Sequence, residues 1–235
     1  MIARNTCKPV VSVVIPAYNE EKNISGILAR TCKAVESSTL PYEIIVVDDG
    51  SKDRTRELAY RHEAIVLWNE TNQGKGAALR KGIARAQGEI VITMDADGSH
   101  DPEEIPKLIQ PMLEGATLSL GTRFASDEGK KSTKTLNLFG NGIINFSIFL
   151  MTGRRVTDSQ CGFRAIRRSF LKHVEITSDG YEVETELLLK ALKNGNVVRE
   201  VSLNVSKRKN GHSHLNPLSD GLKIMKTVVR ANLLN

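Results

Sequence analysis

The chain has 235 residues, of which 40% are hydrophobic and 26% charged, and this balance describes a globular protein that can bury a core. Its 33 basic side chains exceed its 27 acidic ones, which leaves a net charge of +6 at pH 7. Such a charge attracts phosphorylated molecules and anionic surfaces. An aromatic content of 5% is thin for stacking the bases of a nucleic acid, so nucleic acid is not an expected partner.

The cysteines and the apolar stretches bear on the compartment. Cys7, Cys32 and Cys161 form no spaced pairs, so the sequence predicts neither a disulfide framework nor a thiolate zinc site. A reducing, cytoplasmic environment is expected. The first apolar stretch ends at Pro16, too early for a signal peptide, and "LFGNGIINFSIFLM" is interrupted by polar residues. We therefore expect no transmembrane segment and a protein that is soluble or peripheral on a membrane.

Short β-branched runs alternate with segments of helical periodicity along the first half of the chain. In order, strands are expected at 10–16, 42–49, 64–69, 89–95 and 118–124, with helices between them at 21–38, 53–62, 74–87 and 102–113. The strands are almost continuously apolar, as in sheets that are covered on both faces. This alternation predicts an α/β fold with a mostly parallel sheet flanked by helices.

The composition shifts near residue 126, where "ASDEGKKSTKT" predicts a polar loop. Beyond it we expect an apolar helix at 135–151, a loop and strand at 158–168, a helix at 182–195 with acidic residues at its start, a strand at 197–208 and a final helix at 220–234. We interpret this C-terminal helical and loop extension as a layer added to the first half, so that 1–235 forms a single domain.

Polar clusters follow four of the expected strands: "PAYNE" (16–20), "VDDGS" (47–51), "DADGSH" (95–100) and "GTRF" (121–124). Any one of them is also compatible with an ordinary helix cap. In open parallel sheets, however, ligands bind outside the carboxyl ends of the strands. Four clusters at one edge of the sheet therefore predict a ligand site there.

Asp95 and Asp97 give this site a chemistry. Two carboxylates that face one opening repel each other unless a cation neutralises them. Hard oxygen ligands suit Mg²⁺ or Mn²⁺, which take one or two carboxylates and complete their shell with phosphate oxygens and water. The pair therefore predicts a metal–diphosphate site. Neither a P-loop nor a G-x-G-x-x-G motif occurs, which argues against P-loop phosphoryl transfer and hydride transfer.

The motifs and their order resemble those of a known family. "VVIPAYNEE", "IIVVDDGSKDRT", "NQGKGAALRKGI", "DADGSHDPE", "GTRF", "SQCGFRA" and "RKNGHSHL" together resemble family 2 glycosyltransferases, over about residues 10 to 216. The Gly-Phe-Arg and Arg-x-x-Gly-x-Ser elements are most similar to those of the dolichyl- and polyprenyl-phosphate sugar synthases.

The resemblance implies a GT-A fold, with residues 1–125 as the nucleotide-sugar half and 126–235 as the acceptor half. It implies inverting transfer of a hexose from GDP-mannose or a UDP-hexose to dolichyl or polyprenyl phosphate. The nucleoside would be held by Pro16, Tyr18, Glu20, Val47 and Asp49. Ribose, diphosphate and metal would be held by Asp95, Ala96, Asp97 and Ser99, with Asp95 and Asp97 as candidate metal ligands.

Four residues are expected to act directly on the reaction by the same resemblance: Asp97, Arg123, Arg208 and His214. His214 stands where the family usually has a lysine, so its charge depends on pH near neutrality. The acceptor side usually offers an arginine before the apolar helix, and here only Lys130, Lys131 and Lys134 are available; Lys134 is taken as a substrate contact.

Two further segments are open to more than one interpretation. Arg164 is a candidate for aligning the acceptor phosphate, or alternatively braces the "DSQCGF" loop through Asp158. Glu182 suits the first turn of a helix through its interaction with the helix dipole, whereas Glu184 or Glu186 is a candidate for a supporting role at the site.

Alternatives remain for the acceptor and for the class of protein. A transferase that extends a glycan or a lipid-linked saccharide would use the same donor, and a non-catalytic nucleotide-sugar-binding module would need no metal pair. A lipid acceptor implies contact with a membrane. The helix that includes residues 138–151 and the final helix could lie on an anionic leaflet or be buried against the sheet or a second subunit. A membrane partner subunit or a homo-oligomer is a further possibility.

Overall fold

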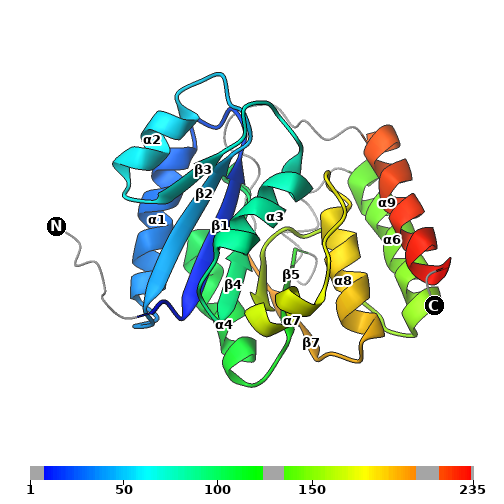
Figure 1. Ribbon diagram of the computed structural model, residues 1–235. Coiled ribbons are helices and arrows are strands. Elements are labelled where there is room, and N and C mark those ends of the chain that lie inside the picture. Colours follow the sequence, from blue (N-terminus) through cyan, green and yellow to red (C-terminus); the bar gives the residue numbers. More distant parts are fainter. Residues whose placement is uncertain (1–7, 124–134, 205–216, 234–235) are drawn as a thin grey trace.

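The computed structural model describes residues 8–123, 135–204 and 217–233. They form one seven-stranded sheet in the order β3-β2-β1-β4-β6-β5-β7, with helices packed on it (Figure 1). The strands span Val11–Ala17 (β1), Tyr42–Asp48 (β2), Ile65–Trp68 (β3), Ile90–Thr93 (β4), Leu118–Thr122 (β5), Arg164–Arg167 (β6) and Val198–Ser202 (β7).

The sheet is mostly parallel, as expected, with one exception. Strands β3, β2, β1 and β4 pair in parallel, and so do β5 and β7, whereas β6 runs antiparallel to both of its neighbours. Because of this reversal Arg164, the first residue of β6, pairs with Thr93, the last residue of β4. The loop that precedes β6 therefore reaches the edge of the sheet at which β4 ends.

The expected helices form with boundaries shifted by a few residues. Residues 102–113 divide into a 3-10 turn, η1, and helix α4. A short helix, α7, forms at residues 168–173, where no helix was expected. The helices span Ile24–Glu36 (α1), Thr55–Arg61 (α2), Lys75–Arg85 (α3), Pro102–Glu104 (η1), Ile105–Leu113 (α4), Thr135–Thr152 (α6), Arg168–His173 (α7), Val183–Lys193 (α8) and Pro217–Leu233 (α9).

The central strands supply the core. Valines and isoleucines of β1, β2 and β4 are buried, which explains why the sequences of these strands are continuous apolar runs. Helix α3 packs on β1 and β2, and α4 packs on β5 and β6. Gly82 allows the close approach of α3, because a Cβ there would lie 2.4 Å from Val14 Cγ1. This packing places the first turn of α3 above the carboxyl ends of the strands.

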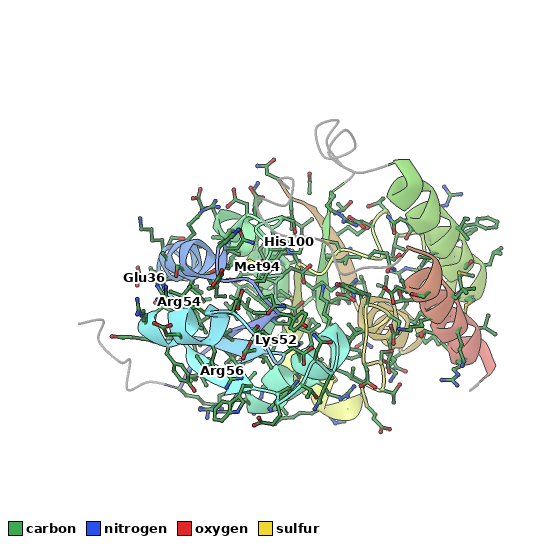
Figure 2. All side chains as sticks on the ribbon, turned by 90° about the horizontal axis from the view of Figure 1, so that it is seen from above. Glu36, Lys52, Arg54, Arg56, Met94 and His100 are labelled. Carbon is green, nitrogen blue, oxygen red and sulfur yellow. The ribbon has the colours of Figure 1, made fainter. Side chains whose placement is uncertain are left out.

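Helices α6 and α9 contact each other and α8 at the end of the molecule opposite α1 and α2 (Figures 1 and 2). Each has one buried face, which includes Ile148 on α6 and Val228 on α9. Each also has large apolar side chains that are exposed, among them Phe146 and Leu222. Each helix therefore has one apolar face that is buried in the molecule and further apolar side chains that are exposed.

Candidate active site

A cavity of about 640 Å³ lies at the carboxyl ends of β1, β2, β4 and β5. Its walls include residues from the segments that follow all four strands, together with the start of α3, the loop before β6, the start of α8 and the first half of α9. The cavity forms there because four strands of the sheet run in the same direction, so their carboxyl ends lie at one edge. The cavity therefore lies where the four polar clusters predicted a ligand site.

Most of the residues selected from the sequence meet in this cavity. Its walls include Pro16, Tyr18, Glu20, Asp49, Asp95, Ala96, Asp97, Ser99 and Arg123. These residues span more than one hundred positions of the chain. Lys134, Arg208 and His214 lie outside the described residues.

Two of the selected residues are not in the cavity wall, and their contact with a substrate stays a prediction. Val47 is fully buried in β2, with its side chain turned toward Gly82 of α3, so it belongs to the core. Arg164 is 1% exposed, and its guanidinium donates hydrogen bonds to the carbonyl oxygens of Ser159, Cys161 and Glu184. Arg164 does brace the loop before β6, but through backbone carbonyls and not through Asp158.

Asp49 shapes the loop that leads into α3. Its Oδ1 accepts hydrogen bonds from Asn69 Nδ2 at 2.7 Å and from the Gln73 amide at 3.0 Å, and its Oδ2 accepts one from the Gly74 amide at 2.8 Å. Gly74 has φ of 100°, a conformation that favours glycine. This loop places Lys75 at the edge of the cavity.

The segment that follows β4 is held by local hydrogen bonds. Asp97 Oδ1 accepts hydrogen bonds from the amide and the hydroxyl of Ser99, at 2.9 and 2.6 Å. His100 is buried against Phe163, with 5.2 Å between the ring centroids, and its Nδ1 accepts a hydrogen bond from the Asp95 amide at 3.2 Å. Figure 2 shows His100 near Met94, toward the inside of the molecule. Burial lowers the pKa of His100 and favours the neutral ring that this hydrogen bond requires.

Lys75 joins two carboxylates in the cavity wall. Its Nζ lies 2.5 Å from Asp95 Oδ1 and 2.6 Å from Glu184 Oε1. Burial alone would lower the pKa of Lys75, but the two carboxylates outweigh this effect and raise it. Burial would likewise raise the pKa of Asp95, whereas Lys75 lowers it to about 2. The lysine and Asp95 are therefore both charged across the neutral pH range.

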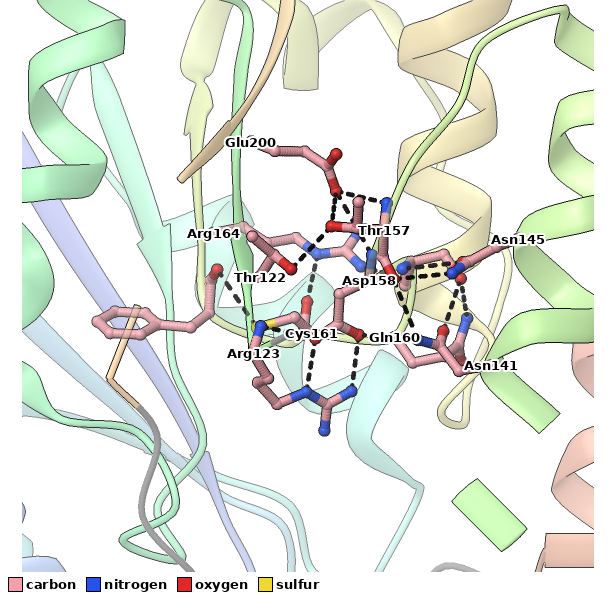
Figure 3. Close-up of polar contacts among 12 residues, drawn as sticks. Thr122, Arg123, Asn141, Asn145, Thr157, Asp158, Gln160, Cys161, Arg164 and Glu200 are labelled. Carbon is pink, nitrogen blue, oxygen red and sulfur yellow. Dashed lines mark hydrogen bonds and ion pairs between the residues drawn. The ribbon is translucent and has the colours of Figure 1, made fainter. Parts of the chain in front are cut away.

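Arg123 is held by Asp158, which is fully buried (Figure 3). The guanidinium donates from Nε to Asp158 Oδ2 at 2.6 Å and from an Nη to Oδ1 at 2.7 Å, and the Arg123 amide also donates to Oδ2. Burial would lower the pKa of Arg123, but this bidentate contact raises it. Asn141 of α6 donates to the same carboxylate at 3.3 Å, so the pair connects β5, the loop before β6 and α6.

The loop at 176–181 closes one side of the cavity by packing on the first turn of α3. The Asp179 carbonyl accepts hydrogen bonds from the Gly76 and Ala77 amides at 2.7 and 3.2 Å, and a Cβ at Gly76 would lie 2.3 Å from the Ser178 carbonyl oxygen. Glu186 of α8 stabilises this loop, because its carboxylate accepts hydrogen bonds from the amides of Thr177 and Ser178.

Glu186 should make stability depend on pH in the acidic range. Burial would raise its pKa, but Lys190 and the loop donors lower it from 4.5 to about 2. A lowered carboxyl pKa stabilises the fold above the pKa of the unfolded state, and this contribution is lost as the pH falls through the folded-state value. Glu186→Gln should therefore lower the free energy of unfolding by about 2–3 kcal/mol near pH 6, and the deficit should shrink between about pH 4.5 and pH 2.

Urea unfolding of the unmodified chain and of Glu186→Gln at several pH values would measure this difference in the free energy of unfolding. Glu175→Gln is the matched control, because the Glu175 side chain is exposed. A deficit that stayed constant from pH 6 to pH 3 would contradict the assignment to the ionised carboxylate of Glu186.

The cavity can be tested for its fit to a divalent metal. Asp95 and Asp97 contribute hard oxygen donors to its wall. Among the described residues no group of three or more His, Cys, Asp or Glu side chains is arranged around one point. Mg²⁺ and Mn²⁺ do not need such a group when phosphate oxygens and water complete the shell. This donor set fits a metal that arrives with a diphosphate.

Several cavity residues were not selected from the sequence. They include Lys75, His100, Gln160, Gly162, Tyr181, Asp220 and Lys223, and Glu184 was considered only for a supporting role. Lys75 and Gly162 belong to the quoted motifs "NQGKGAALRKGI" and "SQCGFRA", so the motifs carried a signal for them. Asp220 and Lys223 lie on the final helix, whose periodicity indicates only that it is amphipathic.

The fold and this cavity define a GT-A type protein. The chain belongs to the family described as Glycosyl transferase family 2, whose sequence profile matches residues 12–175. Solved structures agree. Glucosyl-3-phosphoglycerate synthase from Mycobacterium tuberculosis in complex with UDP superposes with a TM-score of 0.76 at 25% identity, covering 95% of this chain and 80% of that one. The same enzyme with Mn²⁺, UDP and glucosyl-3-phosphoglycerate gives 0.73 at 25% identity, with the same coverage of both chains.

Comparison with known proteins shows which members of the family the chain is similar to. An uncharacterised protein of Methanocaldococcus jannaschii is 38% identical over 83% of this chain and 81% of its own length. A dolichol-phosphate mannosyltransferase of Pyrococcus furiosus is 35% identical over 87% of this chain, and an undecaprenyl-phosphate 4-deoxy-4-formamido-L-arabinose transferase of Photorhabdus laumondii is 38% identical over 69%. The chain spans 59% and 50% of the length of these last two. The predicted likeness to polyprenyl-phosphate sugar synthases is confirmed.

Proposed function

We propose that this glycosyltransferase moves a hexose from a nucleotide diphosphate sugar to a polyprenyl or dolichyl phosphate, with inversion at the anomeric carbon. The observation that carries the proposal is the cavity that joins the four strand ends, with Asp95, Asp97 and Arg123 in its walls. Names of relatives that act on dolichol phosphate and undecaprenyl phosphate support the choice of acceptor. Residues 1–125 would supply most of the donor site and 126–235 most of the acceptor site.

The residues of the cavity suggest how the donor would be held. Pro16, Tyr18 and Asp49 line the part formed by β1 and β2 and would bound the nucleoside. Asp97 would hold Mg²⁺ or Mn²⁺, which when bound offsets the negative charge of the leaving nucleoside diphosphate. Arg123, fixed by Asp158, would contact a phosphate group. Arg208 and His214 stay in the proposal as further phosphate-binding residues, on the strength of the sequence alone.

The acceptor needs little activation. A phosphate monoester is already an anionic nucleophile near neutral pH, so no side chain has to remove a proton from it. The chain would instead align the phosphate behind the anomeric carbon and stabilise the leaving group. This requirement is consistent with a site in which the charged residues are held by ion pairs, as Lys75 and Arg123 are.

The outer faces of α6 and α9 suit contact with an anionic membrane. Phe146 and Leu150 on α6 are 61% and 67% exposed, and Leu222 on α9 is 73% exposed. Two basic residues accompany them on α9, Lys226 and Arg230, and both are exposed. No helix among the described residues has both the length and the apolar character needed to cross a bilayer. We therefore propose peripheral attachment at the cytoplasmic face through these two helices.

Replacing Phe146 and Leu150 by serine should weaken binding to vesicles that contain anionic lipid. Each side chain would lose the free energy of apolar burial, so we expect affinity to fall by about tenfold or more. Co-sedimentation with vesicles of phosphatidylglycerol and phosphatidylcholine would measure it. Tyr60→Ser is the control, because Tyr60 is 51% exposed on α2, at the opposite end of the molecule.

Unchanged vesicle binding in the double variant would contradict the proposed membrane surface. A concentration-dependent dimer that is lost in the variant would instead assign the surface to a second copy of the chain. The described residues and the comparisons give no support for a homo-oligomer or for a membrane partner subunit.

The function is tested by incubating the protein with Mg²⁺ or Mn²⁺, a panel of GDP- and UDP-sugars, and one acceptor at a time. Polyprenyl phosphate, an oligosaccharide and 3-phosphoglycerate are the informative acceptors, and the last represents the activity named for the similar solved structures. Sugar transfer to the lipid phosphate alone supports the proposal. Transfer only to the oligosaccharide or to the small phosphorylated acceptor would replace the acceptor while keeping the donor site.

A further inference from the structure

Lys75 lies in the cavity wall next to Asp95, although the two residues are well separated in the sequence. It is the first residue of α3, and its side chain is 13% exposed. Its ammonium lies 2.5 Å from Asp95, in the segment that follows β4, and 2.6 Å from Glu184 on α8. It also lies 5.7 Å from the centroid of the Tyr181 ring. One side chain thus connects three separate elements of the cavity wall.

The charges of this cluster depend on the lysine. Glu184 is 4% exposed, and neither of its carboxylate oxygens accepts a hydrogen bond from the described residues, so Lys75 supplies its ion pair. Asp95 contacts the same nitrogen, so the two carboxylates lie close together. Without the ammonium, the two carboxylates would lose the cation that lies between them. The position of Asp95 is therefore determined by Lys75 as well as by its own backbone.

Gly162 leaves the space that this ion pair needs. A Cβ at residue 162 would lie 2.8 Å from Lys75 Nζ and 3.1 Å from Asp95 Oδ2. A side chain there would have to displace the ammonium, the carboxylate or both. The loop that precedes β6 thus contributes a close backbone contact to the cluster.

We propose that Lys75 is a positioning residue that orients Asp95 toward the donor nucleotide, with Glu184 as its second carboxylate and Gly162 as the residue that makes room for the contact. This inference rests on the proposed donor site. A merely structural role, in which Lys75 only neutralises two buried acids, is the competing explanation. The two explanations differ in what should happen when Lys75 and Glu184 are removed together.

The test compares Lys75→Met, Glu184→Gln and the double variant with the unmodified chain. Lys75→Met leaves two acids without their cation, so it should lower both stability and nucleotide affinity. In the double variant the second acid is neutral, so most of the stability should return. If Lys75 orients Asp95, affinity for GDP or UDP in the presence of Mn²⁺ should stay about 10- to 100-fold weaker than in the unmodified chain.

Calorimetric titration with GDP and with UDP, each with Mn²⁺, would measure affinity, and urea unfolding would measure stability. Lys33→Met is the control, because Lys33 is exposed on α1 and is not in the cavity wall. Its nucleotide affinity should be unchanged. Gly162→Ala, which crowds the same contact, should weaken nucleotide binding in the same direction as the double variant.

Recovery of nucleotide affinity in the double variant to the level of the unmodified chain would overturn the inference and leave Lys75 a structural role. If the unmodified chain bound neither nucleotide, the donor site and this inference would fall together. Intact nucleotide binding without sugar transfer to any lipid phosphate would overturn only the proposed acceptor.

Discussion

Asp97→Asn should reduce metal-dependent sugar transfer by about 10²- to 10³-fold with little change in the fold. The cause is the loss of a charged oxygen ligand at the point where the leaving diphosphate gains charge. An asparagine keeps a side-chain oxygen that can accept the hydrogen bonds from the Ser99 amide and hydroxyl. The local turn should therefore survive, and the effect should be on the site and not on stability.

The measurement is the initial rate of sugar transfer across a range of Mn²⁺ and Mg²⁺ concentrations, together with calorimetric titration of Mn²⁺ in the presence of GDP or UDP. Asp101→Asn is a close control. Asp101 follows the same segment, but its carboxylate caps η1 through the Glu103 amide and contacts Arg30. It is not in the cavity wall. A full transfer rate in Asp97→Asn would exclude Asp97 as the metal-binding residue.

Asp158→Ala should be the most destabilising single change in the site. The carboxylate is fully buried and accepts hydrogen bonds from the Arg123 side chain and amide and from Asn141. Removing one member of a buried ion pair leaves the other charge without compensation, which costs about 3–5 kcal/mol. Because the Arg123 side chain is 25% exposed and can be partly hydrated, we expect about 3 kcal/mol.

Urea unfolding at neutral pH would test this value. Asp158→Asn should cost less, since an amide oxygen can still accept from the arginine although the charge is gone. Glu200→Gln provides a comparison from the same network, because Glu200 accepts hydrogen bonds from the amide and hydroxyl of Thr157 near the surface (Figure 3). A loss in Asp158→Ala as small as that in Glu200→Gln would contradict the importance of the buried pair.

The sequence indicated Arg123 as a site residue, but it did not predict the ion pair of Arg123 with Asp158. "GTRF" at the end of a strand placed the arginine at the ligand edge. Asp158 lies 35 positions later, and its contact with Arg123 depends on the reversal of β6, which no periodicity in residues 158–168 displays. Sequence patterns report which face of an element is apolar, whereas the order and direction of strands depend on packing between elements.

Sequence alone determined the elements of the first half, the largely parallel sheet and the edge at which the polar clusters collect. It could do so because apolar periodicity is a local property and because parallel strands bring their carboxyl ends to one side. It also placed the chain in its family through motifs that lie at those strand ends.

The tertiary structure decided which of the selected side chains reach the cavity. Val47 and Arg164 follow the family pattern but are buried, since one faces α3 and the other is enclosed by backbone carbonyls. Lys75 and Glu184, which are 109 positions apart as numbered, meet across the cavity wall only because α3 and α8 pack around the same loop. Contacts between distant residues are set by how the elements pack, and a local pattern carries no information about that packing.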